Sequence, residues 1–185
     1  MHRDYVQQPR IHQFPLADLK RRAAATAIDF GLAWLISSLG SGLFGGAIFW
    51  AWIIFLLAWY LLRVLWVTNN QGQSPGHWAL DMKVVQEKSG RLPSWEGLVR
   101  REASLGFACS LLIIALNNSA SYGVLLFLLT IPIGFDLWIA STDREWGQTM
   151  HDRWGKTVII NTTRGYSLDL KIKQWLKEFQ ARSRS

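Results

Sequence analysis

Two long stretches of this chain carry almost no charge. Residues 23–67 contain only two charged side chains, Asp29 and Arg63, and residues 103–142 contain only one, Asp136. In soluble proteins about one residue in four is charged, whereas an ionised side chain is costly in the hydrocarbon of a bilayer. The pattern therefore predicts an integral membrane protein and argues against a disordered chain.

Each uncharged stretch is long enough for two membrane-spanning helices, because about 20 mainly apolar residues cross roughly 30 Å of hydrocarbon. The first divides at a glycine-rich break into candidate spans at 23–39 and 46–67. The second divides at a polar run into candidate spans at 103–116 and 122–140, and the shorter of these is expected to begin near Leu98. We therefore expect an all-α membrane protein, a four-transmembrane-helix bundle made of two hairpins.

The basic residues predict which ends of these helices face the cytoplasm. The segments 1–22, 68–102 and 141–185 contain 5, 5 and 9 Lys and Arg residues, and the two short connections between spans contain none. Because Lys and Arg concentrate in cytoplasmic segments, both termini are expected to be cytoplasmic. The same rule accounts for the net charge of +7, so a nucleic-acid partner is not expected.

The cytoplasmic segments have patterns of their own. Residues 81–85 and 157–160 are β-prone and are expected to pair into a small cytoplasmic β-ribbon. Residues 167–182 have the spacing of a basic amphipathic helix, which would lie on the membrane surface or pack on the cytoplasmic subdomain. The expected organisation is an N-terminal arm, a transmembrane domain with a cytoplasmic loop, a cytoplasmic closing element and an amphipathic tail (residues 1–22, 23–142, 68–102, 143–166 and 167–185).

The three charges within the predicted spans are expected at similar depth, about 6–10 Å from the cytoplasmic interface. We predict that Arg63 pairs with Asp29, Asp136 or both. Such a cluster either fixes helix packing or forms an ion or proton site. Two carboxylates and one guanidinium leave a charge of −1, which a proton or a bound cation would balance, unless Arg22 or Arg100 supplies the missing charge.

Short polar motifs flank the predicted spans in a fixed order. An arginine begins the first span and an aspartate follows seven positions later. A Gly-Gln-Ser-Pro-Gly element follows the second span, an arginine precedes the third, and a His-Asp-Arg element followed by Gly and Thr comes after the fourth. These residues are Arg22, Asp29, Gly72, Gln73, Gly76, Arg100, His151, Asp152, Arg153, Gly155 and Thr157. Over residues 18–162 the chain thus resembles the RDD family of bacterial membrane proteins, named for one arginine and two aspartates.

The resemblance implies a multi-pass protein of the bacterial cytoplasmic (inner) membrane or another internal membrane. It implies that Arg22, Asp29 and Asp152 are the signature residues, with Asp136 as the competing assignment for the second aspartate. It also suggests a transport role, because cation/proton antiport has been proposed for some members of the family.

Two classes of function remain. The first is cation/proton exchange at the intramembrane aspartates, which would require at least a homo-oligomer because four helices are few for a pore. The second is a non-catalytic accessory or assembly factor that docks a membrane-complex partner through its basic cytoplasmic face. The chain has no nucleophile motif and no phosphate-binding loop, and its four His residues and lone Cys109 are widely spaced. Neither enzymatic activity, a metal site nor a cofactor is expected, and the one certain partner is the lipid bilayer.

Overall fold

A computed structural model of the chain describes residues 15–117, 123–143 and 146–162, with scattered positions of the tail between 167 and 180. The predicted tail helix at 167–182 therefore lies largely outside the described residues, as does most of the polar run at 117–121 and residues 1–14 of the arm.

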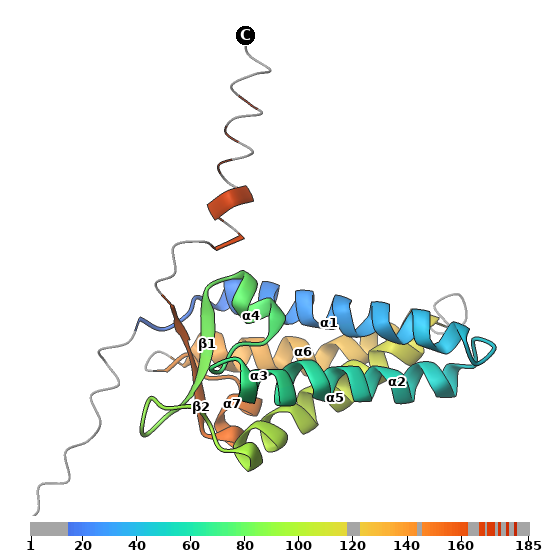
Figure 1. The fold of residues 1–185 in the computed structure, drawn as a ribbon, viewed down its shortest axis with the longest axis horizontal. Coiled ribbons are helices and arrows are strands. Elements are labelled where there is room, and N and C mark those ends of the chain that lie inside the picture. Colours follow the sequence, from blue (N-terminus) through green and yellow to red (C-terminus); the bar gives the residue numbers. More distant parts are fainter. Residues whose placement is uncertain are drawn as a thin grey trace, which may run out of the picture.

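Four helical rods run along the long axis of the molecule (Figure 1). They are α1 (Leu19–Gly42); the continuous rod of α2 (Ile48–Tyr60), the π-helical turn η2 (Leu61–Leu65) and α3 (Trp66–Asn69); α5 (Trp95–Asn117); and α6 (Gly123–Thr142). The first rod extends through the glycines expected to break it, because the turn between the rods lies at residues 43–47, where Gly45 and Gly46 have positive φ angles. The third rod begins at Trp95 rather than near Leu98.

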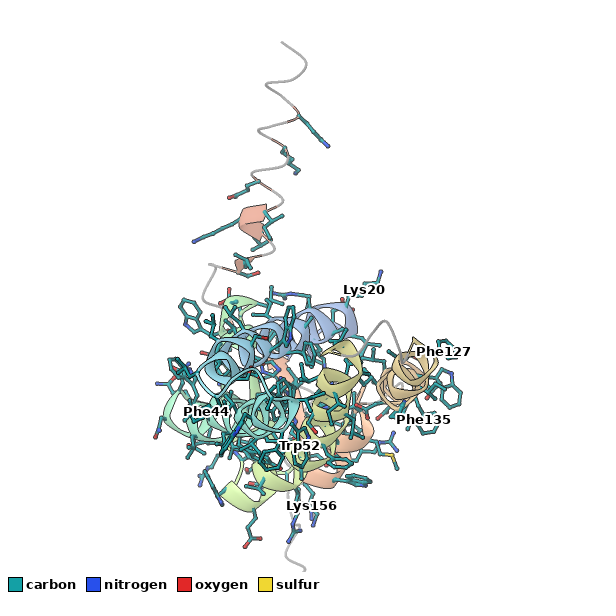
Figure 2. The ribbon with its side chains drawn as sticks, turned by 90° about the vertical axis from the view of Figure 1, so that its right-hand side faces the viewer. Lys20, Phe44, Trp52, Phe127, Phe135 and Lys156 are labelled. Atoms are coloured by element: carbon teal, nitrogen blue, oxygen red, sulfur yellow. The ribbon has the colours of Figure 1, made fainter. Side chains whose placement is uncertain are left out.

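By length and composition, α1 and the second rod, Ile48–Asn69, are able to cross a membrane. The first two turns of α5 carry four charged residues (Glu96, Arg100, Arg101 and Glu102), so its apolar part is shorter than the helix. Helix α6 has large apolar side chains on its outer side. Figure 2 shows Phe127 and Phe135 directed away from the other helices, and these side chains are 69% and 51% exposed.

Small side chains allow α1 to pack closely on its neighbours. The buried positions of α1 recur every three or four residues and therefore form one face, which consists of Arg22, Ala25, Asp29, Ala33, Ser37 and Ser41. Ser37 donates a hydrogen bond to the carbonyl of Ala51 in α2 at 2.6 Å. The core of the bundle contains Ala33, Phe55, Ala58, Trp59, Leu62, Leu105, Cys109 and Ile113.

The remaining elements gather at one end of the bundle and form what we call the cap (Figure 1). The cap consists of α4 (Pro75–Ala79), β1 (Met82–Gln86), α7 (Met150–Gly155) and β2 (Thr157–Asn161). Strands β1 and β2 are antiparallel, with Val84 opposite Ile159, which confirms the predicted ribbon. The start of the described chain lies along β2, where the Ala17 N–H donates to the Ile159 carbonyl at 3.0 Å.

Candidate functional site: a buried ion network

Six charged side chains form a continuous chain of ion pairs where the bundle meets the cap. Acids and bases alternate in the order Asp29, Arg63, Glu102, Arg101, Asp152 and Arg22. Each of the six is at most 6% exposed. Three carboxylates balance three guanidinium groups, so the network has a formal charge of zero. Its members come from α1, η2, α5 and α7, and it therefore ties three segments of the helical bundle to the cap.

Helix α1 supplies both ends of the network. Arg22 and Asp29 are seven residues apart, which places them two turns apart on the same buried face. Arg22 donates to Asp152 and to the carbonyl of Gly147 in the loop before α7. Asp29 instead accepts from Arg63 at 2.7 Å. One face of α1 thus contributes two members of the network, which lie two helical turns apart.

The π-helical turn η2 presents Arg63 to the interior of the bundle. Its Nη1 donates to Asp29, and its Nε donates to Glu102 Oε2 at 2.7 Å. The guanidinium carbon lies 5.0 Å from the centre of the Trp59 ring, which is a cation–π distance. Trp59 itself fits against α5 because Gly106 has no side chain, since a Cβ there would lie 2.6 Å from the ring. Arg63 therefore has partners on every side.

Helix α5 contributes two consecutive members, Arg101 and Glu102. Glu102 accepts three hydrogen bonds, from Arg63 Nε at 2.7 Å, Arg63 Nη2 at 3.2 Å and Arg101 Nη1 at 2.8 Å. The Arg101 Nε donates to Asp152 Oδ1 at 2.8 Å. The predicted charge cluster did not include either residue, although the third span was expected to begin near Leu98, before both of them. Ser94 is the residue in the sequence that indicates the start of this helix, because its hydroxyl accepts a hydrogen bond from the Gly97 N–H, as the side chain of an N-cap residue does.

Asp152 joins the cap to the network and also begins α7. Thr149 and Asp152 form a reciprocal capping box at the N-terminus of α7. Burial acts to raise the pKa of Asp152, but the neighbouring Arg22 and Arg101 charges outweigh it and hold the pKa well below its usual range. Asp152 is therefore ionised at any physiological pH.

The α4 turn closes over Asp29 from the cap side. The Gly76 N–H donates to Asp29 Oδ1 at 2.7 Å, and the Ser74 hydroxyl donates to Asp29 Oδ2 at 2.6 Å. Burial and the charges of Arg63 and Arg101 lower the pKa of His77 well below its usual value, so its ring is neutral. The Ser74 hydroxyl proton is directed to Asp29, so Ser74 Oγ can only accept from the His77 ring. The His77 Nδ1, which lies 2.7 Å from Ser74 Oγ, therefore carries the ring proton and donates it to that oxygen.

Gly72 and Gly76 in this element are each required for a different physical reason. Gly72 has a φ of +88°, and a Cβ there would lie 2.5 Å from the Val84 carbonyl oxygen. Gly76 is required by proximity, because a Cβ would lie 2.1 Å from the carbonyl oxygen of Ala25 in α1. Between them, the buried Gln73 donates to the Met82 carbonyl at 2.7 Å. The predicted loop motif is thus the segment that fastens the cap to α1 around Asp29.

A family model for the RDD family matches residues 16–156 of the chain, which is most of its length. The chain belongs to the RDD family. No curated protein and no solved structure matches it.

Arg22, Asp29 and Asp152, which the resemblance implies are the signature residues, all belong to one network. Arg63 was predicted to pair with Asp29, Asp136 or both, and in the structure it pairs with Asp29. Its second carboxylate partner is Glu102, which was not predicted.

Asp136 has a different set of partners. It forms an ion-pair contact with His151 Nδ1, and its other oxygen accepts from the Met150 N–H at 2.7 Å. Asp136 therefore connects α6 to the start of α7. The network containing Asp29 is balanced without Asp136, and among the described ion pairs Asp136 adjoins it only through His151, whose Nε2 lies 3.8 Å from Asp152 Oδ1.

Other predicted motif residues of this RDD protein lie outside the network. Arg100 is on the surface, 3.6 Å from Glu96, and its neighbour Arg101 takes the buried position. Arg153 is also on the surface, 3.1 Å from Asp143. The two remaining residues have packing roles: Gly155 allows α7 to cross α5 within van der Waals contact of Arg101, and the buried Thr157 hydroxyl donates to the Asp152 carbonyl at 3.3 Å.

Two cavities adjoin α6. One of about 250 Å³ lies between α1, α5 and α6, and one of about 170 Å³ lies between α5, α6 and α7. Asp136 and His151 line both cavities, whereas Asp29 and Arg63 line neither. Within the described part of the chain, no group of three His, Cys, Asp or Glu residues could hold a metal ion.

Proposed function

We propose that this RDD protein is a non-catalytic accessory or assembly factor of a membrane complex, with four spans and both termini in the cytoplasm. The observation that carries the proposal is the closure of the ion network. An exchange site must leave a carboxylate accessible to an ion and able to change its protonation state. Asp29 is fully buried and accepts hydrogen bonds from Arg63, Ser74 and Gly76, so its two oxygens are already occupied.

A closed network of this kind suits a scaffold. It fixes the position of α7 and the β-ribbon relative to the membrane helices, so the cap presents a constant surface. Six exposed basic residues lie on or next to the cap: Lys20, Lys88, Arg91, Arg100, Arg153 and Lys156. Among the described residues on or next to the cap, the exposed acidic residues are Asp18 and Glu96. Exposed basic residues thus outnumber exposed acids around the cap and occur on more than one side of it, as Lys20 and Lys156 show (Figure 2), and this favours a partner with an acidic face.

Site-specific photo-crosslinking in cells tests the docking role. A crosslinker at Arg91 is expected to capture one discrete protein, and the additional change Lys88→Glu is expected to reduce the captured band at least several-fold by reversing a neighbouring charge. A crosslinker at Leu39, far from the cap on α1, is the matched control. Capture of the same protein from both positions, or no effect of Lys88→Glu, would contradict docking through the basic surface.

Cysteine labelling tests the four-span arrangement. The lone native Cys109 is buried and only 3% exposed, so it gives little background. Ser89→Cys in the β1–α5 connection should react only from the cytoplasmic side, and Gly45→Cys in the α1–α2 turn only from the opposite side. Labelling of both from the same side would overturn the arrangement.

Cation/proton exchange is the second candidate, and one observation favours it. The Asp136–His151 pair contains two titratable groups, lies in the wall of both cavities, and is partly exposed, with side chains 16% and 11% accessible. Proteoliposome flux of Na⁺, K⁺ and H⁺ separates the candidates. The accessory role predicts no flux above empty liposomes. Flux that Asp136→Asn abolishes and the surface change Glu96→Gln preserves would replace it with exchange at Asp136.

A further inference from the structure

The larger cavity, of about 250 Å³, has an apolar body and a polar end. Its apolar wall includes Ala27, Phe30, Leu105, Leu112, Ile133 and Leu137. Its polar end includes Arg22, Arg101 and Thr149, which lie at the junction with the cap. The cavity thus has the amphipathic lining of a site for a molecule with a hydrocarbon tail and a polar head.

Arg22 has an unused hydrogen-bond donor at this polar end. Its two terminal nitrogens donate to Asp152 and to the Gly147 carbonyl, but its Nε is buried and has no partner. The side chain is only 7% exposed. A buried N–H without an acceptor is unfavourable, so a ligand oxygen at the polar end would satisfy it once the Arg22 side chain, which lines the cavity, turns toward that oxygen. Neither the ion network nor the proposed docking surface uses this donor.

We infer that the cavity binds one acyl chain of an anionic phospholipid from the cytoplasmic leaflet, with a phosphate or ester oxygen accepting from Arg22 Nε. The volume is below the range of about 300–1,000 Å³ typical of drug-sized ligand pockets, so it holds part of one chain and not a whole lipid.

The position of the cavity identifies the source of this chain. Helices α1 and α6 form two of its walls, and the apolar side chains on the outer side of α6 are exposed (Figure 2). A lipid beside α6 therefore has its tail at the level of the cavity. This step rests on the proposed four-span arrangement, which the cysteine labelling tests separately.

The charges around the polar end favour an anionic headgroup. The first turn of α1 contains Lys20, which is exposed, and Arg22, which lines the cavity, whereas Arg21 between them donates to the Leu80 carbonyl of the cap. The acid in the opposite wall, Asp136, already accepts from the Met150 N–H and contacts His151. Basic pockets between membrane helices on the cytoplasmic side are suited to anionic lipid headgroups.

Native mass spectrometry of the full-length protein tests the inference. The protein is delipidated in detergent and titrated with phosphatidylglycerol or phosphatidylethanolamine. The wild-type protein is expected to retain one phosphatidylglycerol per chain, with at least tenfold preference over phosphatidylethanolamine. Equal retention of the two lipids would overturn the assignment of an anionic lipid. Displacement of the bound lipid by soluble glycerol phosphate would show that the headgroup alone is recognised and would overturn the tail site.

Two matched substitutions on α1 test the location. Ala27→Leu places additional carbon atoms in the cavity and is expected to weaken phosphatidylglycerol binding at least tenfold. Ala24→Leu makes the same change at an exposed position that does not line the cavity, and should leave binding within twofold of wild type. Equal binding by all three proteins would refute the site.

A third variant tests the headgroup contact. Arg22→Lys keeps a positive charge beside Asp152 but removes the Nε donor, so the preference for phosphatidylglycerol should fall while the acyl chain still binds. An unchanged preference would exclude Arg22 Nε as the headgroup contact. Because Ala27→Leu leaves the ion network intact, it remains decisive even if Arg22→Lys folds poorly.

Discussion

Glu102→Gln should destabilise this protein far more than any surface charge change on the same helix. Glu102 is fully buried and accepts three hydrogen bonds from two arginines. The glutamine keeps the shape of the side chain but removes the charge, and its NH₂ group replaces an acceptor with a donor that faces guanidinium N–H groups. The network is then left with an uncompensated positive charge in a buried position.

The expected magnitude follows from the burial of the pair. Removing one partner of a buried ion pair typically costs about 3–5 kcal/mol, and we expect Glu102→Gln to fall in this range. Glu96 provides the matched control, because it lies on the same helix and pairs with Arg100 at 3.6 Å, but its side chain is 79% exposed. An exposed pair at this spacing contributes about 0.3–0.5 kcal/mol.

Equilibrium unfolding of the purified protein in mixed micelles measures both variants against wild type. Glu96→Gln should unfold with a midpoint close to that of wild type, and Glu102→Gln should unfold at a much lower denaturant concentration. If the two substitutions had equal effects, or if Glu102→Gln cost less than about 1 kcal/mol, the network would not have the structural role derived from its burial.

Three further predictions follow from individual contacts. Gly76→Ala should lower stability by several kcal/mol because its Cβ would meet the α1 backbone at 2.1 Å, whereas Gly31→Ala, with open space around it, should have no measurable cost in thermal unfolding. The pKa of Asp152 is depressed in the fold, so its contribution to stability is complete above the unfolded pKa of about 3.9 and is lost as the pH falls below it. Unfolding measured from pH 6 to pH 3 should therefore have a shallower pH dependence in Asp152→Asn, and an unchanged slope would contradict the ion pairing. Asp136→Asn should cost only about 1 kcal/mol in the same unfolding assay, because its partner His151 and its own carboxylate are partly exposed; a cost as large as that of Asp152→Asn would be inconsistent with this difference.

The parts of the fold that could be predicted from the sequence are those set by local periodicity. The seven-residue spacing of Arg22 and Asp29 places them on one helix face in any α-helix, and the β-prone segments at 81–85 and 157–160 are paired as expected. The contact between Arg63 and Asp29 also followed from the high cost of an isolated charge among apolar residues.

The composition of the network could not be predicted in the same way. Arg101 and Glu102 were not expected in the network because charges at the start of the third span, expected near Leu98, were taken to face the membrane interface; the helix begins at Trp95, and both side chains are buried. Arg101 is buried and Arg100 is exposed because of how α5 is rotated about its own axis. That rotation could not be predicted without knowing where the helix begins and what it packs against. The partner of Asp136 depends on where α7 packs, and this is a tertiary contact with no local signal.

The coupling free energy between Arg101 and Asp152 is the most direct test of the claim that the ion network fastens the cap to the helical bundle. A double-mutant cycle with Arg101→Gln and Asp152→Asn isolates this term, and the exposed pair of Arg100 and Glu96 provides the control cycle. We predict a coupling of about 2–3 kcal/mol for the buried pair and at most about 0.5 kcal/mol for the exposed pair. Additive effects of Arg101→Gln and Asp152→Asn would contradict the account.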